Sequence, residues 1–228
     1  LAKPLDANYK KLPLINELIA IIPAYGIGLN DNPYSITGFY FPPIGVWNHP
    51  HHNGFPSDPQ NLPESQQKDY RQISIGNVRR VTDKSTEINL GKTFIERSNI
   101  HPLLPFEGDI LYEGRWGNSI RVGSTVKNTP NNWSTTGSNG DPIMILRNGQ
   151  GVQTEEGWIP TIEDINNDDS SIYQTSTQKI PLNASSTSYF SYKSNPPQAP
   201  NQYTGKQIII NSGRLVFNST VDHILLSS

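Results

Sequence analysis

The chain has 228 residues and no cysteine. Disulfides, thiolate metal sites and a cysteine nucleophile are therefore excluded. Charge is also sparse, since charged residues make up 17% of the chain and the formal net charge is −2. That balance lacks the basic footprint of a protein that binds nucleic acid or an anionic membrane. The sequence also has no run of 18 apolar residues, so we expect no transmembrane helix.

Hydrophobic residues are few as well, at 34% of the chain. Uncharged polar residues replace them, because the chain contains 23 Asn and 22 Ser, and with 18 Gly and 19 Pro it is rich in turn formers. Its low net charge and its aromatic content of 9% argue against a disordered chain. A helical bundle would be rich in Ala, Glu, Lys and Leu. This composition predicts an all-β protein with long polar loops.

Several segments have the pattern of strands. Residues 14–22 predict a strand or a short helix, and 38–41 and 44–47 predict short strands. The proline-rich stretch 48–67 predicts a long loop. Two strands are expected on either side of residues 114–118. Further strands are expected at 142–147, closed by a type I′ turn at Asn148-Gly149, and at 171–178.

The C-terminal residues repeat with a period of eight. Ile208, Val216 and Ile224 occupy equivalent positions, and so do Phe217 and Leu225 one residue further on. Each octad has an extended apolar part and a short polar turn, which is typical of a β repeat. Two and a half octads cannot bury a core alone, whereas three chains winding together can. The alternative is a pair of ordinary strands with this spacing by chance.

A β domain followed by a Ser/Pro-rich linker and octads resembles the central spike protein of contractile-tailed phages. Three segments of the chain are similar to segments of baseplate hub or spike proteins of T-even-like marine phages. These segments are residues 99–121, 163–173 and 209–219. The resemblance covers about residues 70–228. It implies an OB-fold barrel over residues 1–182, a linker over 183–206 and the start of a trimeric triple-stranded β-helix over 207–228.

Such proteins dock as homotrimers on the baseplate hub beneath the tail tube and help to pierce the host envelope. The expectation for this chain is therefore a structural component of the virion tail, without enzymatic activity and without a cofactor. The octad positions expected in the trimer core are Ile208, Ile210, Val216, Phe217, Ile224 and Leu225.

Two patterns could bind a metal ion. His49, His51 and His52 form a cluster with His-x-His spacing that suits zinc, iron or nickel; alternatively, these histidines form hydrogen bonds within the loop. Asp164, Asn166 and Asp168 match the opening of a calcium loop, but position six of that loop is not Gly and position twelve is not Glu. The alternative is an Asx-rich turn before a strand.

Two further functions remain open. Trp47, Trp116, Trp133 and Trp158 could form a platform for a host surface glycan, or they could pack in the core or at a trimer interface. A cell-wall hydrolase would need two carboxylates, one with a raised pKa. Asp109 and Glu113 share one face of a predicted strand. The other interpretation is that they are half-solvated strand charges. Arg121 and Arg115 fit interface or salt-bridge roles.

Overall fold

The structure is a computed structural model that describes residues 2–14, 17–25, 36–50, 99–126, 131, 133, 138–151, 159–186 and 197–225. The side chains of residues 24, 25, 36 and 37 lie outside this description. The chain divides into two compact units, Leu1–Arg97 and Ser98–Ser228. Within the described residues every regular element is a strand, and no helix there is long and apolar enough to cross a membrane. The prediction of an all-β protein is confirmed at this level.

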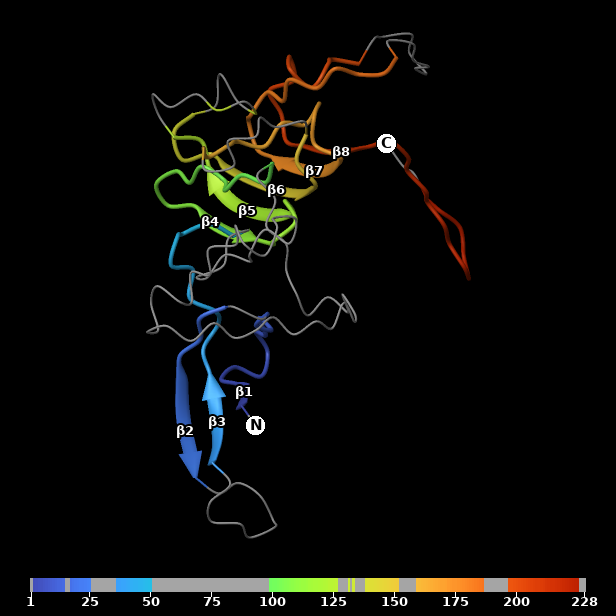
Figure 1. Cartoon of the computed structure of the whole chain (residues 1–228). Helices are drawn as coiled ribbons and strands as arrows, with labels where there is room; N and C mark the ends of the chain where they lie inside the picture. The colour runs from blue at the N-terminus through green and yellow to red at the C-terminus, as the bar shows by residue number, and fades with distance from the viewer. Residues whose placement is uncertain are drawn as a thin grey trace, which may run out of the picture. The chain divides into compact units, whose positions relative to one another are not determined.

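The first unit contains a three-stranded sheet in the order β1-β3-β2 (Figure 1). Strand β3 (Ile36–Tyr40) pairs in parallel with β1 (Ala2–Pro4) and antiparallel with β2 (Ile21–Tyr25). A Cβ atom at Gly38 would lie 2.7 Å from the Ile21 side chain, so only glycine fits at that position without a shift.

Two strand predictions in this unit need correction. The strand predicted at 14–22 begins only at Ile21, because a turn precedes it in which Leu14 donates its N–H to the Glu17 carboxylate. The strand predicted at 44–47 is reduced to a single bridge between Ile44 and Leu18. The strand predicted at 38–41 corresponds to β3. Most of the loop predicted at 48–67 lies outside the described residues.

The second unit contains a five-stranded antiparallel meander in the order β4-β5-β6-β7-β8. Its strands are β4 (Ile110–Glu113), β5 (Ser119–Ser124), β6 (Pro142–Asn148), β7 (Ser170–Thr175) and β8 (Gln207–Ser212). The two strands predicted around residues 114–118 are therefore confirmed. The turn between them closes with a 2.8 Å hydrogen bond from Gly114 N to Asn118 O, and it places Gly117 at a φ of +82°.

The turn predicted after β6 is wrong in type. A type I′ hairpin needs a positive φ at both central residues. Gly149 has a φ of 76°, but Asn148 is not among the residues with positive φ. The next strand begins only at Ser170, so β6 and β7 are not joined by a two-residue turn. A Cβ atom at Gly149 would lie 2.0 Å from the Asp169 carboxylate, so a close approach of the chain also favours this glycine.

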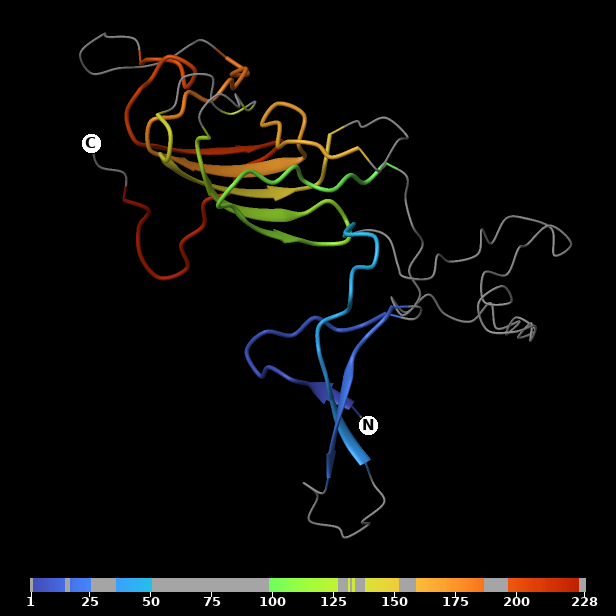
Figure 2. The same ribbon diagram turned by 90° about the vertical axis from the view of Figure 1, so that its left-hand side faces the viewer.

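The hydrophobic core of the second unit lies on one side of the sheet. Ile143, Ile145, Tyr173 and Ile209 project from β6, β7 and β8 into a buried cluster. The connecting segments cover these side chains with Phe106, Trp133, Ile165 and Ile180. Figure 2 shows the sheet nearly edge-on, with its connecting segments gathered on one side.

The described strands of this unit form an open sheet and do not close into a barrel. Strand β8 is hydrogen-bonded to β7, so the first octad forms the edge of this sheet. Part of the predicted linker also packs against the unit, since Ile180 N donates to Pro200 O at 3.1 Å. The OB-fold, the β-helix and the domain limits at 182 and 206 stay predictions.

Candidate functional site

Among the described residues, one face of the five-stranded sheet carries side chains that are exposed or half-buried. Antiparallel pairing places alternate residues of neighbouring strands side by side on this face. Two adjacent rows cross all five strands, and we call them together the open face. The first row is Tyr112, Ile120, Leu146, Ile172 and Ile210, and the second is Ile110, Val122, Met144, Gln174 and Ile208.

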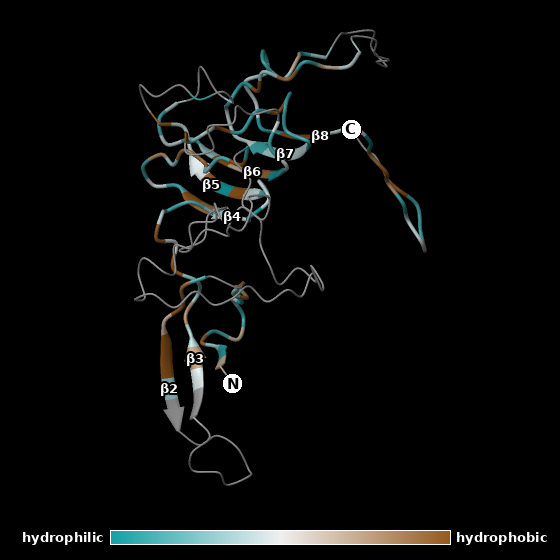
Figure 3. Cartoon of the chain, viewed as in Figure 1, coloured by the Kyte–Doolittle hydropathy of each residue, from teal (hydrophilic) through white to brown (hydrophobic). Residues whose placement is uncertain are grey.

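Nine of these ten side chains are hydrophobic and none is charged. Tyr112 is 54% exposed and Ile208 is 69% exposed, at opposite edges of the sheet. Polar uncharged residues flank the rows, with Asn148, Ser170 and Ser212 at one end. Figure 3 shows the hydrophobic residues on these strands in brown. An apolar centre with a polar rim is the composition of a protein interface.

The opposite face of the sheet, which the core covers, carries charged side chains beside hydrophobic ones. There Arg121 lies between Leu111 and Ile145, and Arg147 lies between Ser119 and Ser171. Both arginine side chains are 0% exposed. The sheet therefore buries its arginines together with Ile143, Ile145 and Ile209, whereas the two rows on its other face carry no charge.

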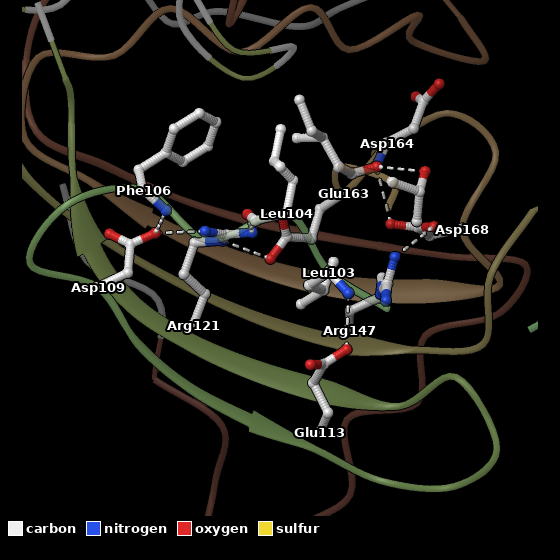
Figure 4. Close-up of polar contacts among 12 residues, drawn as sticks. Leu103, Leu104, Phe106, Asp109, Glu113, Arg121, Arg147, Glu163, Asp164 and Asp168 are labelled. Carbon is white, nitrogen blue, oxygen red and sulfur yellow. Dashed lines mark hydrogen bonds and ion pairs between the residues drawn. The ribbon is translucent and has the colours of Figure 1, made fainter. Parts of the chain in front are cut away.

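Every nitrogen of the Arg121 guanidinium group has a hydrogen-bond or ion-pair partner (Figure 4). Nε donates to Glu163 Oε1 at 2.7 Å, Nη2 donates to Leu104 O at 2.9 Å, and Nη1 bonds to the Asp109 carboxylate. The guanidinium carbon lies 4.9 Å from the ring centroid of Trp133 and 5.5 Å from that of Phe106. A buried charge is costly without partners, so the pairing of Arg121 favours this face of the sheet as the inward one.

A second group of charges surrounds Arg147 (Figure 4). Its Nη1 lies 3.7 Å from Asp168 Oδ1, and Asp168 Oδ2 accepts a 2.9 Å hydrogen bond from Asp164 N. Burial raises the pKa of the Asp168 carboxyl to about 6 against the opposing effect of Arg147. Burial also raises the pKa of Glu113, whose Oε1 accepts a 2.7 Å hydrogen bond from Leu103 N.

These two findings together define the candidate site. An antiparallel sheet of a monomer typically packs one face on the core and turns a polar face to water. Here the face that carries Arg121 and Arg147 is buried against the core, so it cannot serve as the face in water. Within the described residues the hydrophobic face has no such polar face to replace it, which makes the open face the candidate surface for association with a macromolecule.

The C-terminal segment, residues 213–225, continues directly from β8 without further strand pairing (Figure 1). Two local hydrogen bonds lie within it, from Asp222 N to Ser219 Oγ and from His223 N to Asp222 Oδ1. Six of its apolar side chains are exposed: Leu215, Val216, Phe217, Val221, Ile224 and Leu225.

The structure separates the predicted octad positions into two groups. Ile208 and Ile210 lie on β8 and belong to the open face. Val216, Phe217, Ile224 and Leu225 lie in the C-terminal segment and are exposed. One described chain therefore brings none of the latter four into its own core, and their role in a trimer core stays a prediction.

The predicted metal residues are placed only in part. His49 is buried, while His51 and His52 lie outside the described residues. Within the described part of the chain, no three His, Asp or Glu side chains are grouped so that they could hold a metal ion. The His cluster as a metal site thus stays a prediction.

The Asp164, Asn166 and Asp168 oxygens already accept hydrogen bonds from the protein. Asp164 Oδ1 accepts from Asn166 N at 3.0 Å, and Asn166 Oδ1 accepts from Asn183 N at 2.8 Å. Together with the Asp168 bond described above, these contacts form the Asx-rich turn that was the alternative interpretation. Calcium binding by these residues stays a prediction.

The carboxylate pair is placed differently from the expectation. Asp109 and Glu113 do face the same side of the chain, but it is the covered side. The Asp109 side chain is 1% exposed and is paired with Arg121, so the description as a half-solvated charge is wrong for Asp109, whereas Glu113 is half-buried. A raised pKa is also present, at Glu113, which the sequence did not indicate. Both carboxylates serve as hydrogen-bond acceptors within the covered face.

The described tryptophans lie in different environments. Trp133 is buried in the core, where its ring meets Phe106 edge to face at a centroid distance of 5.7 Å. Trp47 and Trp116 are each about half exposed, and Trp158 lies outside the described residues. Trp133 therefore packs in the core, as one of the two interpretations predicted.

Most of the open face escaped the sequence analysis. Its row-forming residues on β4 to β7 were interpreted as ordinary strand positions. The signal was the alternation in Ile120-Arg121-Val122 and Leu146-Arg147, which defines two faces for each strand. Only the pairing register shows that the aliphatic faces of five strands coincide.

Comparison with protein-family models, with curated proteins and with solved structures found no match for this chain.

Replacing Arg121 with Met tests whether the buried network holds the sheet. The variant leaves the Asp109 and Glu163 carboxylates buried without their cation, so we expect a loss of about 3–5 kcal/mol in the free energy of unfolding. Urea unfolding followed by tryptophan fluorescence measures it. The control Arg214→Met, at an exposed position, should change stability by no more than about 0.5 kcal/mol. Equal stability of the two variants would contradict the role of Arg121.

The raised pKa of Asp168 predicts a pH dependence of stability. The folded chain holds this proton up to about pH 6, whereas the ordinary value is 3.8. The folded state thus binds more protons between these values, and the free energy of unfolding should fall as the pH rises through them. In Asp168→Asn this slope should flatten, while the exposed control Asp222→Asn should keep it. Urea unfolding at half-unit pH steps measures the slopes; an unchanged slope in Asp168→Asn would contradict the assignment.

Proposed function

We propose that this protein is a structural component of a phage virion, the trimeric central spike of a contractile tail baseplate. The observation that carries the proposal is the open face: nine hydrophobic side chains in two rows, uncharged, on a sheet whose charged face is already buried. A surface of this kind favours a permanent assembly over a solitary domain. The resemblance of residues 99–121, 163–173 and 209–219 to baseplate spike proteins supports the particular assembly.

The partners follow from this proposal. Three copies of the chain associate through the octads of residues 207–228, and the second unit docks on a baseplate hub protein at the end of the tail tube. A triple-stranded β-helix has few free strand edges and many hydrogen bonds between chains. It is therefore stiff along its axis and transmits the force of contraction to the host envelope. Strand β8 supports the connection, because the first octad belongs to the sheet and joins the second unit directly to the helix.

Truncation tests the trimer. Light scattering should give the full chain a mass near three times 25.4 kDa. Removal of residues 213–228 keeps β8 in the sheet and should reduce the mass to that of one chain. A chain that is monomeric at full length would contradict the proposal.

A single substitution tests the octads more sharply. Val216→Asp places a carboxylate at an octad position, and three copies of it near one axis would be buried without partners. We expect the trimer to be abolished or weakened at least 100-fold in dissociation constant. The matched control is Asn218→Asp, which adds the same charge two residues away in the polar turn of the octad. A trimer that survives Val216→Asp would contradict the β-helix.

A further inference from the structure

We propose that the turn of residues 163–168 clamps the end of β8 from which the C-terminal segment leaves, and that it thereby fixes the direction in which that segment starts. The inference concerns contacts within one copy of the second unit, so it holds whether or not the chain forms a trimer. Only its consequence for the spike rests on the proposed function, in which the same contacts carry the load on the octads into the centre of the sheet.

The end of β8 at Ser212 is the place where the chain is most easily peeled from the sheet. Among the described strands β8 is at the edge, because it pairs with β7 on one side only. Its last residue, Ser212, pairs with Ser170, and the described residues beyond it add no further strand pairing. The end of an edge strand opens at a low cost in free energy, because few contacts hold it. A load on the C-terminal segment therefore acts first on this end.

A side chain ties this end of β8 to the core. Asn211 is the penultimate residue of the strand, and its Nδ2 donates a 2.5 Å hydrogen bond to Ile165 O, 46 residues away along the chain. Ile165 is 2% exposed and belongs to the hydrophobic core. At the other end of β8 the bonds are longer, since Gln207 Nε2 lies 3.3 Å from Pro200 O and Gln207 O accepts from Thr175 Oγ1 at 3.4 Å. The shorter contact lies where the chain leaves the sheet.

The turn that accepts this bond is closed by hydrogen bonds of its own. Asp168 N donates to Asp164 O at 2.8 Å, and Asp164 N donates to Asp168 Oδ2 at 2.9 Å. Asn167 adds a third bond by donating from Nδ2 to Asp164 Oδ2 at 2.7 Å. These internal bonds hold the Ile165 carbonyl group in a fixed position, so it is a firm anchor for the Asn211 side chain.

Ion pairs fasten the turn to the middle of the sheet (Figure 4). At its first residue, Glu163 Oε1 accepts a 2.7 Å bond from Arg121 Nε on β5. At its last residue, Asp168 Oδ1 lies 3.7 Å from Arg147 Nη1 on β6. All four side chains are at most 2% exposed, so water screens these pairs little. The contact of Asn211 therefore connects β8 to β5 and β6 without passing through β7.

The same turn holds the segment that follows β7. Asn166 Nδ2 donates to Pro181 O at 2.7 Å, and Asn166 Oδ1 accepts from Asn183 N at 2.8 Å. Residues 181–183 and Asn211 are thus attached to adjacent residues of one turn. Because the chain is attached to this turn both before and after the predicted linker, the turn positions the exit from β8, and the length of the linker does not.

Hydrogen exchange followed by NMR tests the clamp. Asn211→Asp keeps the size of the side chain but replaces its amide group with a carboxylate, which cannot donate to Ile165 O. We expect the amide protons of residues 207–212 to exchange about tenfold faster, the effect of losing roughly one hydrogen bond, while those of β5 and β6 keep their wild-type rates. The matched control is Asn218→Asp, which adds the same charge at an exposed position of the C-terminal segment and should change none of these rates.

A second variant separates the lost bond from the added charge. Asn211→Leu removes the donor without adding a charge and should give the same local acceleration. Wild-type rates in both variants would overturn the clamp, and so would acceleration in Asn211→Asp alone, because repulsion would then be its cause. An equal acceleration in β5, β6 and β8 would also overturn it, since the effect would be on global stability.

Light scattering on the same samples distinguishes this inference from the proposed function. A monomeric wild-type chain whose Asn211 variants show the local acceleration supports the clamp and overturns the trimer. A wild-type trimer whose Asn211 variants exchange like the wild type overturns the clamp alone.

The direction of the C-terminal segment is measured with pairs of spin labels, which a chain without cysteine accepts at chosen positions. Glu107 is exposed, and a Cβ atom at Gly213, directly after β8, would meet no atom within 4 Å. With labels on Glu107→Cys and Gly213→Cys, and with unlabelled chain in excess, we expect one narrow distribution of distances. Adding Asn211→Leu should at least double its width, whereas adding Asn218→Asp should leave it narrow. An unchanged width in Asn211→Leu would overturn the inference.

Discussion

The fully paired guanidinium of Arg121 is the contact on which the second unit depends. It bonds to carboxylates from two connecting segments, Asp109 and Glu163, and packs against two aromatic rings. A buried arginine with these partners is far less costly than one with any partner missing. The network thereby favours one face of the sheet as the inward one, and Ile120, Val122 and Leu146, which alternate with the arginines along β5 and β6, lie on the other face.

The inward face of the sheet therefore carries both the hydrophobic core and the buried arginines, and the two rows on the other face carry no charge. The inward face is rich in groups that titrate or pair, such as Arg147 with Asp168, and its order depends on their partners. The outward face gains nothing from water and gains most from a cover. Burial of apolar surface is favourable by about 25 cal/mol per Å². A cover over the open face therefore favours association of the unit, without any change in its fold.

The position of β8 joins the sheet to the proposed spike. Ile208 and Ile210 belong both to the first octad and to the open face, while Ile209 between them reaches the buried core. One side of β8 is thus buried in the core of the unit, while its other side is exposed. Whatever covers the open face also contacts the start of the octads, so docking of the sheet and growth of a trimeric helix would proceed from the same edge.

The sequence by itself determined the all-β class, the strands on either side of residues 114–118 and the positions of β6, β7 and β8, because period-two alternation and turn residues are local signals. It also showed that Asp109 and Glu113 share a face. Only the tertiary structure decided which face is inside. Alternation is symmetric under exchange of the two sides, and polarity alone would have turned Arg121 and Asp109 toward water. Their burial follows from partners 42 and 12 residues apart along the chain, which no local pattern specifies.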